Sequence, residues 1–362
     1  MQRRTLLTAA LGAMGWQAQA QAQTKRVPLA DMHSHYGLLQ RTLDKSGLAE
    51  DLREQGVVLM AWKLVADSRW LRASGSGIVQ ASEPKPGELT AHFDSQLARM
   101  KAYLAQTGLR TVLTPADVDA ALAGGAPGVV LASEGADFLE SRVDALAPAV
   151  AQGLRHLQLV HYIRSPIGDF QTEAPVHRGL SQVGRHLIEA CNAQGVLVDL
   201  AHSTVEAVEQ ALQVAKAPMV WSHGWVDRNP GHWQDGAGYM RRRLSLEHAR
   251  KIAAAGGVVG LWGLGLSNPA PRVAMGDGGW TVGRGDTRGL ARELAALVQR
   301  IGAEHVALGT DIEGVGPSWA LNQYSHLRSV IDHLQGEGLS ADAIEQVAYR
   351  NYARVLKAAL KG

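Results

Sequence analysis

The feature that most constrains the fold is a set of eight short apolar runs, separated by longer stretches with helical periodicity. Each run holds mostly apolar, often β-branched residues, which is typical of a buried strand. Strands that alternate with helices favour a parallel sheet. Eight of them predict an α/β fold of the closed (β/α)₈ TIM-type barrel class. An open doubly wound sheet is the alternative, but that fold gathers its chemistry at one switch point.

The ends of these runs carry the chemically active residues of the chain. Helices are predicted over residues 181–194, 203–216, 245–255 and 287–301, from their apolar periodicity and their capping residues. In a barrel all strands run the same way, so their C-terminal ends form one face. The runs end, in chain order, at His33, Lys63, Glu134, His161, His202, His223, Trp262 and Asp311. Seven residues at these ends should therefore ring a single pocket: His33, His35, Glu134, His161, His202, His223 and Asp311.

Histidines and carboxylates dominate this predicted ring and indicate a metal site. His35 joins His33 on one face, because side chains alternate along a strand with period two. Imidazole and carboxylate together suit Zn²⁺ or a similar divalent ion. A single histidine at a strand end is more often structural, so the prediction rests on the repetition over several strands. Glu134 would bridge two cations, and Asp199 either orients a ligand or pairs within the barrel.

The N-terminus predicts export. Residues 1–22 have a basic start with Arg3 and Arg4, a short apolar run, and A-x-A cleavage sites after Ala20 or Ala22. The paired arginines are typical of a twin-arginine signal, with a plain Sec signal as the alternative. The apolar run is too short to span a bilayer. We therefore expect a periplasmic protein without a membrane anchor, in which residues 23–362 form a single barrel domain.

Composition excludes several other classes of protein. The net charge is +2 and basic residues form no large block, so nothing favours a nucleic-acid partner. Cys191 is the only cysteine, which excludes an internal disulfide framework. We expect Cys191 to be a small core residue of a helix rather than a reactive thiol.

The motifs at the strand ends resemble those of the membrane dipeptidase (renal dipeptidase-like) zinc metallopeptidases, a branch of the amidohydrolase-type barrels. The resemblance runs from about residue 29 to residue 357. It is most specific in G-L-S-Q-V-G-R-H-L-I-E-A-C-N-A-Q-G-V-L-V-D-L-A-H, and it includes G-V-V-L-A-S-E-G, A-P-M-V-W-S-H and L-G-T-D-I-E-G-V. Such a resemblance implies hydrolysis of dipeptides by a hydroxide that bridges two Zn²⁺ or other divalent ions. Family members are often dimers, so a homodimer is possible.

The resemblance also implies a role for each matching residue. His33 and His35 would bind the first ion, His202 and His223 the second, and Glu134 both. As catalytic residues, Asp311 would hold the bridging water and move its proton, and His161 would contact the substrate or the tetrahedral intermediate. Arg242 would bind the substrate carboxylate, with Arg241 and Arg243 as alternatives in the same R-R-R run.

Two departures from the family pattern bear on the substrate. The family usually has H-x-D at the first strand, whereas His35 makes this motif H-x-H. The segment between His223 and Arg241 is also longer than expected and should overhang the pocket. The first alternative function is therefore a metal-dependent hydrolase of another small amide, a lactone or a modified peptide in a secreted-metabolite pathway. The second is a low-turnover periplasmic metal-containing maturation protein.

Overall fold

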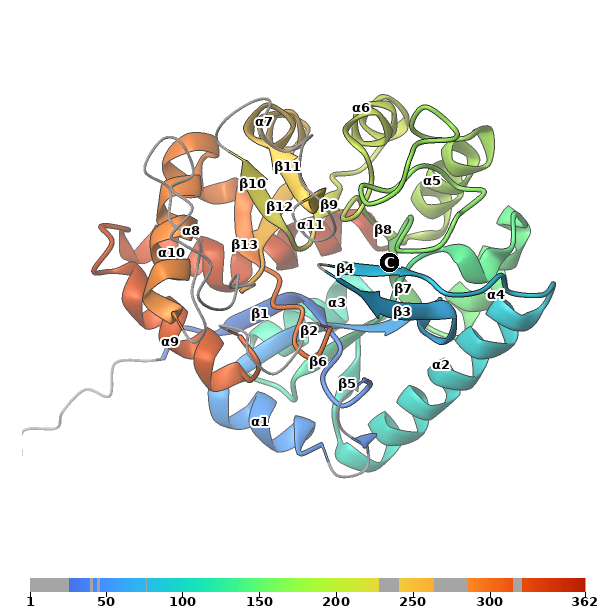
Figure 1. Cartoon of the computed structure of the whole chain (residues 1–362). Coiled ribbons are helices and arrows are strands. Elements are labelled where there is room, and N and C mark those ends of the chain that lie inside the picture. The colour runs from blue at the N-terminus through green and yellow to red at the C-terminus, as the bar shows by residue number, and fades with distance from the viewer. Residues whose placement is uncertain are drawn as a thin grey trace, which may run out of the picture.

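The computed structural model describes residues 26–39, 42–43, 46–75, 77–227, 241–263, 286–314 and 321–361. Strands form a ring at the centre of the molecule, with helices around it (Figure 1). The predicted signal segment, residues 1–22, lies outside the described residues, as does most of the long segment after His223. Export and its route therefore stay predictions. Within the part of the chain that is described, no helix is long and apolar enough to cross a membrane.

Eight parallel strands build a nearly closed barrel, as predicted. Their order in the sheet is their order along the chain, and a short strand β5 (Arg110–Thr111) adds to β6. The last strand returns to the first, because the Asp311 N–H donates to the His33 carbonyl (2.9 Å) and the His35 N–H to the Ile312 carbonyl (3.0 Å). The strands are β1 (Leu29–Ser34), β2 (Val57–Val65), β6 (Gly128–Glu134), β7 (Leu154–Gln158), β8 (Leu197–Asp199), β9 (Val220–Trp221), β12 (Val258–Leu261) and β13 (Val306–Leu308).

Helices between the strands cover the outside of the barrel (Figure 1). The four helices expected from the sequence are present, and a side chain caps the N-terminus of each: Ser181, Thr204, Ser245 and Asp286. The α-helices are α1 (Leu48–Gln55), α2 (Glu88–Thr107), α3 (Pro115–Leu122), α4 (Leu146–Ala151), α5 (Gln182–Gln194), α6 (Val205–Val214), α7 (Leu246–Ala254), α8 (Thr287–Ile301), α9 (Tyr324–Leu334), α10 (Ala341–Glu345) and α11 (Asn351–Ala359).

Alternating side chains of the strands divide the core into two layers. Met60 and Trp62 of β2 pack outward against the helices, whereas Leu59 and Ala61 pack inside the barrel. Residues Tyr352, Val355 and Leu356 of α11 join the inner layer. The end of the barrel opposite the strand tips is therefore filled with apolar side chains, which leaves the chemistry to the other end.

A register irregularity in β1 turns both histidines of the H-x-H motif into the barrel mouth. Ala30 and Met32 face the inner layer, and the pairing of β1 with β2 shifts between Asp31 and Ser34. The shift lets His33 follow Met32 on the inner side, which simple alternation does not allow. The expectation that His33 and His35 share a face is confirmed, and the irregularity is the local reason they can both face the pocket.

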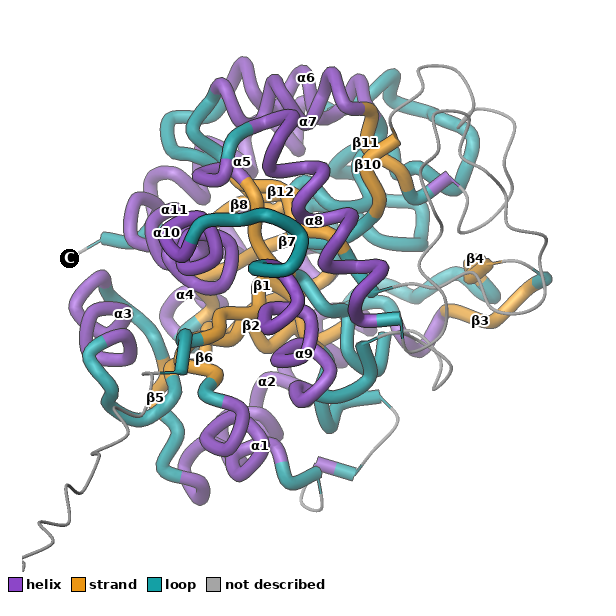
Figure 2. The backbone as a smooth tube through the Cα atoms, turned by 90° about the vertical axis from the view of Figure 1, so that its left-hand side faces the viewer, coloured by secondary structure: helices purple, strands orange, loops and turns teal. Residues whose placement is uncertain are grey.

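Two small strand pairs at the mouth were not expected from the sequence. β3 (Leu71–Ser74) pairs antiparallel with β4 (Gly77–Gln80), and β10 (Trp225–Asp227) pairs in parallel with β11 (Arg243–Ser245). The β3–β4 hairpin lies at one end of the barrel, and α11 and the C-terminus lie at the other (Figure 2). Both pairs thus frame the end of the barrel where the strands finish.

Candidate active site

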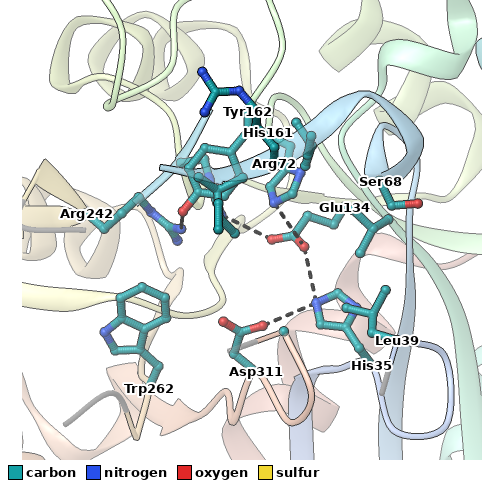
Figure 3. A pocket seen from close by; sticks show the side chains of 16 residues that line it. His35, Leu39, Ser68, Arg72, Glu134, His161, Tyr162, Arg242, Trp262 and Asp311 are labelled. Atoms are coloured by element: carbon teal, nitrogen blue, oxygen red, sulfur yellow. Dashed lines mark hydrogen bonds and ion pairs between the residues drawn. The ribbon is translucent and has the colours of Figure 1, made fainter. Parts of the chain in front are cut away.

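Glu134 stands at the centre of the predicted ring of histidines. Its two carboxylate oxygens lie 3.1–3.5 Å from the Nε2 atoms of five histidines that reach it from four other strand ends. Figure 3 shows Glu134, His35 and Asp311 pointing toward one another from separate segments of the ribbon. The barrel therefore brings together all seven residues that the sequence placed in one pocket. The histidines are His33, His35, His161, His202 and His223.

Three overlapping groups of these side chains could each hold a metal ion. The first is His33, His35 and Glu134, and the second is Glu134, His202 and His223; a third joins His33, His223 and Asp311. Within each group the ligand atoms lie within 4.8 Å of one another. Glu134 belongs to both of the first two groups, which is the position expected for a carboxylate that bridges two ions.

Backbone and side-chain acceptors fix the orientation of two of the rings. His35 Nδ1 lies 2.7 Å from the carbonyl oxygen of Lys63, which can only accept, so Nδ1 carries the proton. His161 Nδ1 lies 2.7 Å from Asp67 Oδ1, and the other oxygen of Asp67 accepts the N–H of Tyr162 (3.1 Å). Both rings consequently turn Nε2 toward Glu134, as metal or substrate ligands require.

The backbone at two site residues is strained. His202 has φ 71° and Asp311 has φ 54°, in the left-handed region that non-glycine residues rarely occupy. Gly314 is required beside Asp311, because a Cβ there would lie 2.0 Å from Asp311 Oδ1. Strain of this kind concentrates at functional sites.

His202 is also a buried histidine without hydrogen-bond partners. Among the described residues, neither of its ring nitrogens makes a hydrogen bond, although Nε2 lies 3.1 Å from Glu134 Oε1. A buried polar atom left without a partner costs about 1–3 kcal/mol. A metal ion on Nε2 would remove part of that cost, so this ring fits a ligand better than a structural role.

Electrostatics favour positive charge beside Glu134. Burial by itself would raise the pKa of Glu134, but His161 and His33 hold it well below its usual range. Burial lowers the pKa of His35, yet its bonds to Asp311 and Glu134 raise it to about 10. A divalent cation would compete for the place that this proton takes.

The histidines of the second group stay neutral. Burial, reinforced by Arg242, holds the pKa of His202 well below its usual range. Burial, His33 and Arg242 do the same for His223. Neutral imidazole is the form that ligates metals, so both rings are in the protonation state that a metal site needs.

A cavity of ≈ 270 Å³ opens above this cluster. His161, Tyr162 and Trp262 form part of its wall, and Leu71 and Ile78 of the β3–β4 hairpin close another side. Arg242 lines it as well and is 1% exposed; its Nη1 donates to the Tyr162 hydroxyl (3.1 Å), and its guanidinium lies 4.7 Å from the Trp262 ring centre. The cavity thus combines an apolar wall, a buried cation and the carboxylate–histidine cluster.

The structure separates the three consecutive arginines. Only Arg242 of the three lines this cavity. Arg241 lines a different surface pocket, with Gln171 and Glu206, and the guanidinium of Arg243 lies 5.2 Å from the ring centre of Trp225. The geometry therefore favours Arg242 as the residue that could reach a substrate at the cluster.

Several residues that support the site were missed or left open by the sequence. Lys63 lies fully buried near the end of β2 and pairs with Asp199, so Asp199 does pair within the barrel. Gln158 accepts from Lys63 (3.4 Å) and donates to Glu134 Oε1 (3.3 Å). Asp67 orients His161 from 94 residues away. Lys63 lies at the end of an apolar run, so the sequence pattern marked it as a strand-end residue, whereas no sequence pattern marked Asp67.

Comparison with known proteins decides the family. The profile of the membrane dipeptidase family (peptidase family M19) matches residues 19–361. The chain belongs to this family. The clustered histidines and carboxylates at its barrel mouth are candidate metal ligands.

Individual relatives are distant. The chain is 28% identical over 208 residues to dipeptidase tcpJ of Claviceps purpurea, which is 57% of this chain and 44% of that protein. It is 26% identical to an uncharacterised protein in the pqqA 5′ region of Klebsiella pneumoniae, over 75% of this chain and 97% of that one. The chain thus spans about half the length of the fungal dipeptidase that it matches.

Solved structures share the fold over almost the whole chain. A family M19 metallopeptidase named dipeptidase AC superposes with a TM-score of 0.76 at 17% identity, covering 93% of this chain and 100% of that one. A metallopeptidase from Rhodobacter sphaeroides, solved with a phosphinate mimic of the dipeptide L-Ala-D-Ala, gives 0.74 at 18% identity, over 92% and 99% of the chains. At such identities the likeness concerns the barrel.

Proposed function

We propose that this protein is a dipeptidase that uses two divalent metal ions, Zn²⁺ by preference, held at the mouth of the barrel. The observation that carries the proposal is the position of Glu134, which belongs to two separate three-residue ligand groups. His33 and His35 would complete the first ion's site, and His202 and His223 the second. Borderline nitrogen ligands with a bridging carboxylate suit zinc.

The chemistry divides between the ions and the chain. Two bound divalent ions would lower the pKa of a water between them toward ~7 and polarise the scissile carbonyl. Asp311 reaches into the same cluster, with Oδ1 3.2 Å from His35 Nε2. Burial raises the pKa of Asp311, and the neighbouring His35 opposes that rise. A carboxylate tuned upward in this way can take a proton from the water and deliver it to the leaving amine.

His161 would stabilise the substrate oxygen. Its Nδ1 is held by Asp67, and Nε2 faces the cluster 3.3 Å from Glu134 Oε2. Burial lowers the pKa of His161, but Asp67 and Glu134 raise it above its ordinary value overall. A ring that retains its Nε2 proton can donate to the developing oxyanion.

Arg242 would select substrates with a free carboxylate. It is the buried guanidinium in the cavity wall, and it is held between Tyr162 and Trp262. Arginine binds carboxylates with two parallel hydrogen bonds, which fixes their orientation. A cavity of ≈ 270 Å³ leaves room for a small substrate, so we propose short peptides with a C-terminal carboxylate, dipeptides first.

The test is hydrolysis of a panel of L,L- and L,D-dipeptides by the purified protein loaded with Zn²⁺, with a chelated sample beside it. We expect metal-dependent cleavage that Asp311→Asn abolishes, whereas Arg241→Ala, outside the cavity, leaves cleavage intact. The panel includes N-terminally blocked amides and lactones. If the protein cleaves blocked amides or lactones but no dipeptide, the proposed substrate class is wrong and the cleaved class takes its place. If it cleaves none of these compounds, the result supports a low-turnover maturation protein.

A further inference from the structure

One hydroxyl group touches histidines from both candidate ion sites. Ser222 Oγ lies 3.0 Å from Nδ1 of His33 and 3.0 Å from Nδ1 of His223, and Ser222 is fully buried. The two rings come from β1 and from the end of β9, and their centres lie 3.8 Å apart. His33 belongs to the first ligand group and His223 to the second. Ser222 therefore links the two halves of the site.

Hydrogen bonding determines which nitrogen of His223 carries the proton. Arg242 can only donate, and its Nη2 lies 2.9 Å from His223 Nε2, so that nitrogen presents a lone pair. An imidazole ring keeps a proton on at least one nitrogen, so Nδ1 carries it and donates to Ser222 Oγ. His33 can use Nε2 as a ligand atom only in the same tautomer, with Nδ1–H directed at the same oxygen. A hydroxyl oxygen has two lone pairs and can accept both bonds.

The backbone around Ser222 holds this hydroxyl in place. Its N–H donates to Asp199 Oδ1 (3.0 Å), and the other oxygen of Asp199 pairs with Lys63. Its carbonyl packs against Gly260 and Gly309, where an added Cβ would lie 2.1 Å and 1.8 Å from the carbonyl oxygen. Two glycines on the neighbouring strand segments are thus needed for Ser222 to sit where its hydroxyl meets both rings.

We propose that Ser222 is a positioning residue shared by the two ion sites, which holds one histidine of each with Nε2 toward its ion and thereby couples the binding of the two ions. The proposal rests on the proposed function, because it assumes that both ligand groups bind metal. Partners that orient metal-ligating histidines typically contribute 10–100-fold in affinity. A single hydroxyl that orients two ligands should therefore affect two binding constants together.

The test is calorimetric titration of the metal-free protein with Zn²⁺, for wild type and Ser222→Ala. We expect both stepwise dissociation constants to rise by about 10–100-fold in the variant. Ser133→Ala is the matched control: Ser133 is also buried and next to a ligand, but its hydroxyl donates to the Gly135 carbonyl (2.8 Å) and touches no histidine. We expect that control to bind both ions as wild type does.

Unchanged constants, or a change in only one of them, would overturn the shared role of Ser222. Wild-type protein that binds fewer than two ions would instead overturn the proposed function, so the two failures are distinguishable. If Ser222→Ala does not fold, ¹⁵N NMR of the histidine rings in wild-type protein gives a second test. There we expect His33 and His223 both protonated at Nδ1, and a proton on Nε2 alone in either ring would contradict the proposal.

Discussion

Two buried polar clusters lie in the same barrel, and they differ in how their charges are balanced. Inside the barrel, Lys63 pairs with Asp199, and His156 lies 3.2 Å from the Tyr352 hydroxyl. At the mouth, His202 has no hydrogen-bond partner among the described residues, and both it and Asp311 have strained backbones. The inner cluster balances its own charges, whereas the mouth cluster gathers lone pairs around one carboxylate. The cluster that balances its own charges supports the fold, whereas the mouth cluster is the candidate metal site.

The largest expected effect is at the mouth. Asp311→Asn keeps the shape of the side chain but cannot take the proton of the attacking water. We expect kcat to fall by about 10³-fold, equal to about 4 kcal/mol of transition-state stabilisation. The metal-free protein should unfold at the same urea concentration as wild type. Steady-state kinetics measures the change in kcat, and urea unfolding measures the stability. A kcat equal to that of wild type would show that Asp311 does not transfer the proton.

A substitution in the inner cluster should lower the stability of the fold, which Asp311→Asn should leave unchanged. Lys63→Met leaves the fully buried Asp199 carboxylate without its cation, which should lower the free energy of unfolding by about 3–5 kcal/mol. The double variant Lys63→Met/Asp199→Asn removes the stranded charge and should recover part of that loss. Urea unfolding of the three proteins measures both steps. Equal stability of Lys63→Met and wild type would show that the pair does not support the fold.

The stability of the inner cluster should also depend on pH. Burial and the charge of Lys63 lower the pKa of His156 to about 4, against the pull of Asp199. The unfolded chain takes up a proton near pH 6.5 and the folded chain does not, so this stability is present above pH 6.5 and is lost as the pH falls to 4. The loss amounts to about 3 kcal/mol. Unfolding of wild type and His156→Gln at pH 7 and pH 4 measures it, and a pH-independent difference between them would contradict this pKa.

The smallest expected effect concerns the H-x-H motif. His35→Asp introduces the anionic residue that the resemblance to the family implies at this position, and it adds one negative charge beside Glu134. Carboxylates favour harder ions, so we expect the preference for Zn²⁺ over Mn²⁺ to fall by about 10-fold. Competition between the two ions, followed by metal analysis, measures the ratio. An unchanged ratio would mean that residue 35 does not ligate the first ion.

The same contrast shows how much could be predicted from sequence. The mouth was predictable because each candidate ligand lies at or just after the end of an apolar run, and a barrel brings strand ends together whatever their separation in the chain. Support from Asp67, Gln158 and Ser222 was not predictable, because those contacts depend on tertiary pairing and leave no periodic signal. The β3–β4 hairpin and the irregularity in β1 were missed for the same reason. Arg242 could be separated from Arg241 and Arg243 only once the cavity was known.

The most direct test of the central claim is the metal content of the purified chain after incubation with Zn²⁺ and removal of unbound ions. We predict two ions per chain for wild type and for the control Ser133→Ala, and at most one for Glu134→Gln, which loses the carboxylate shared by both ligand groups. Two ions per chain in Glu134→Gln, or none in wild type, would contradict the proposal that the mouth cluster is a two-metal site.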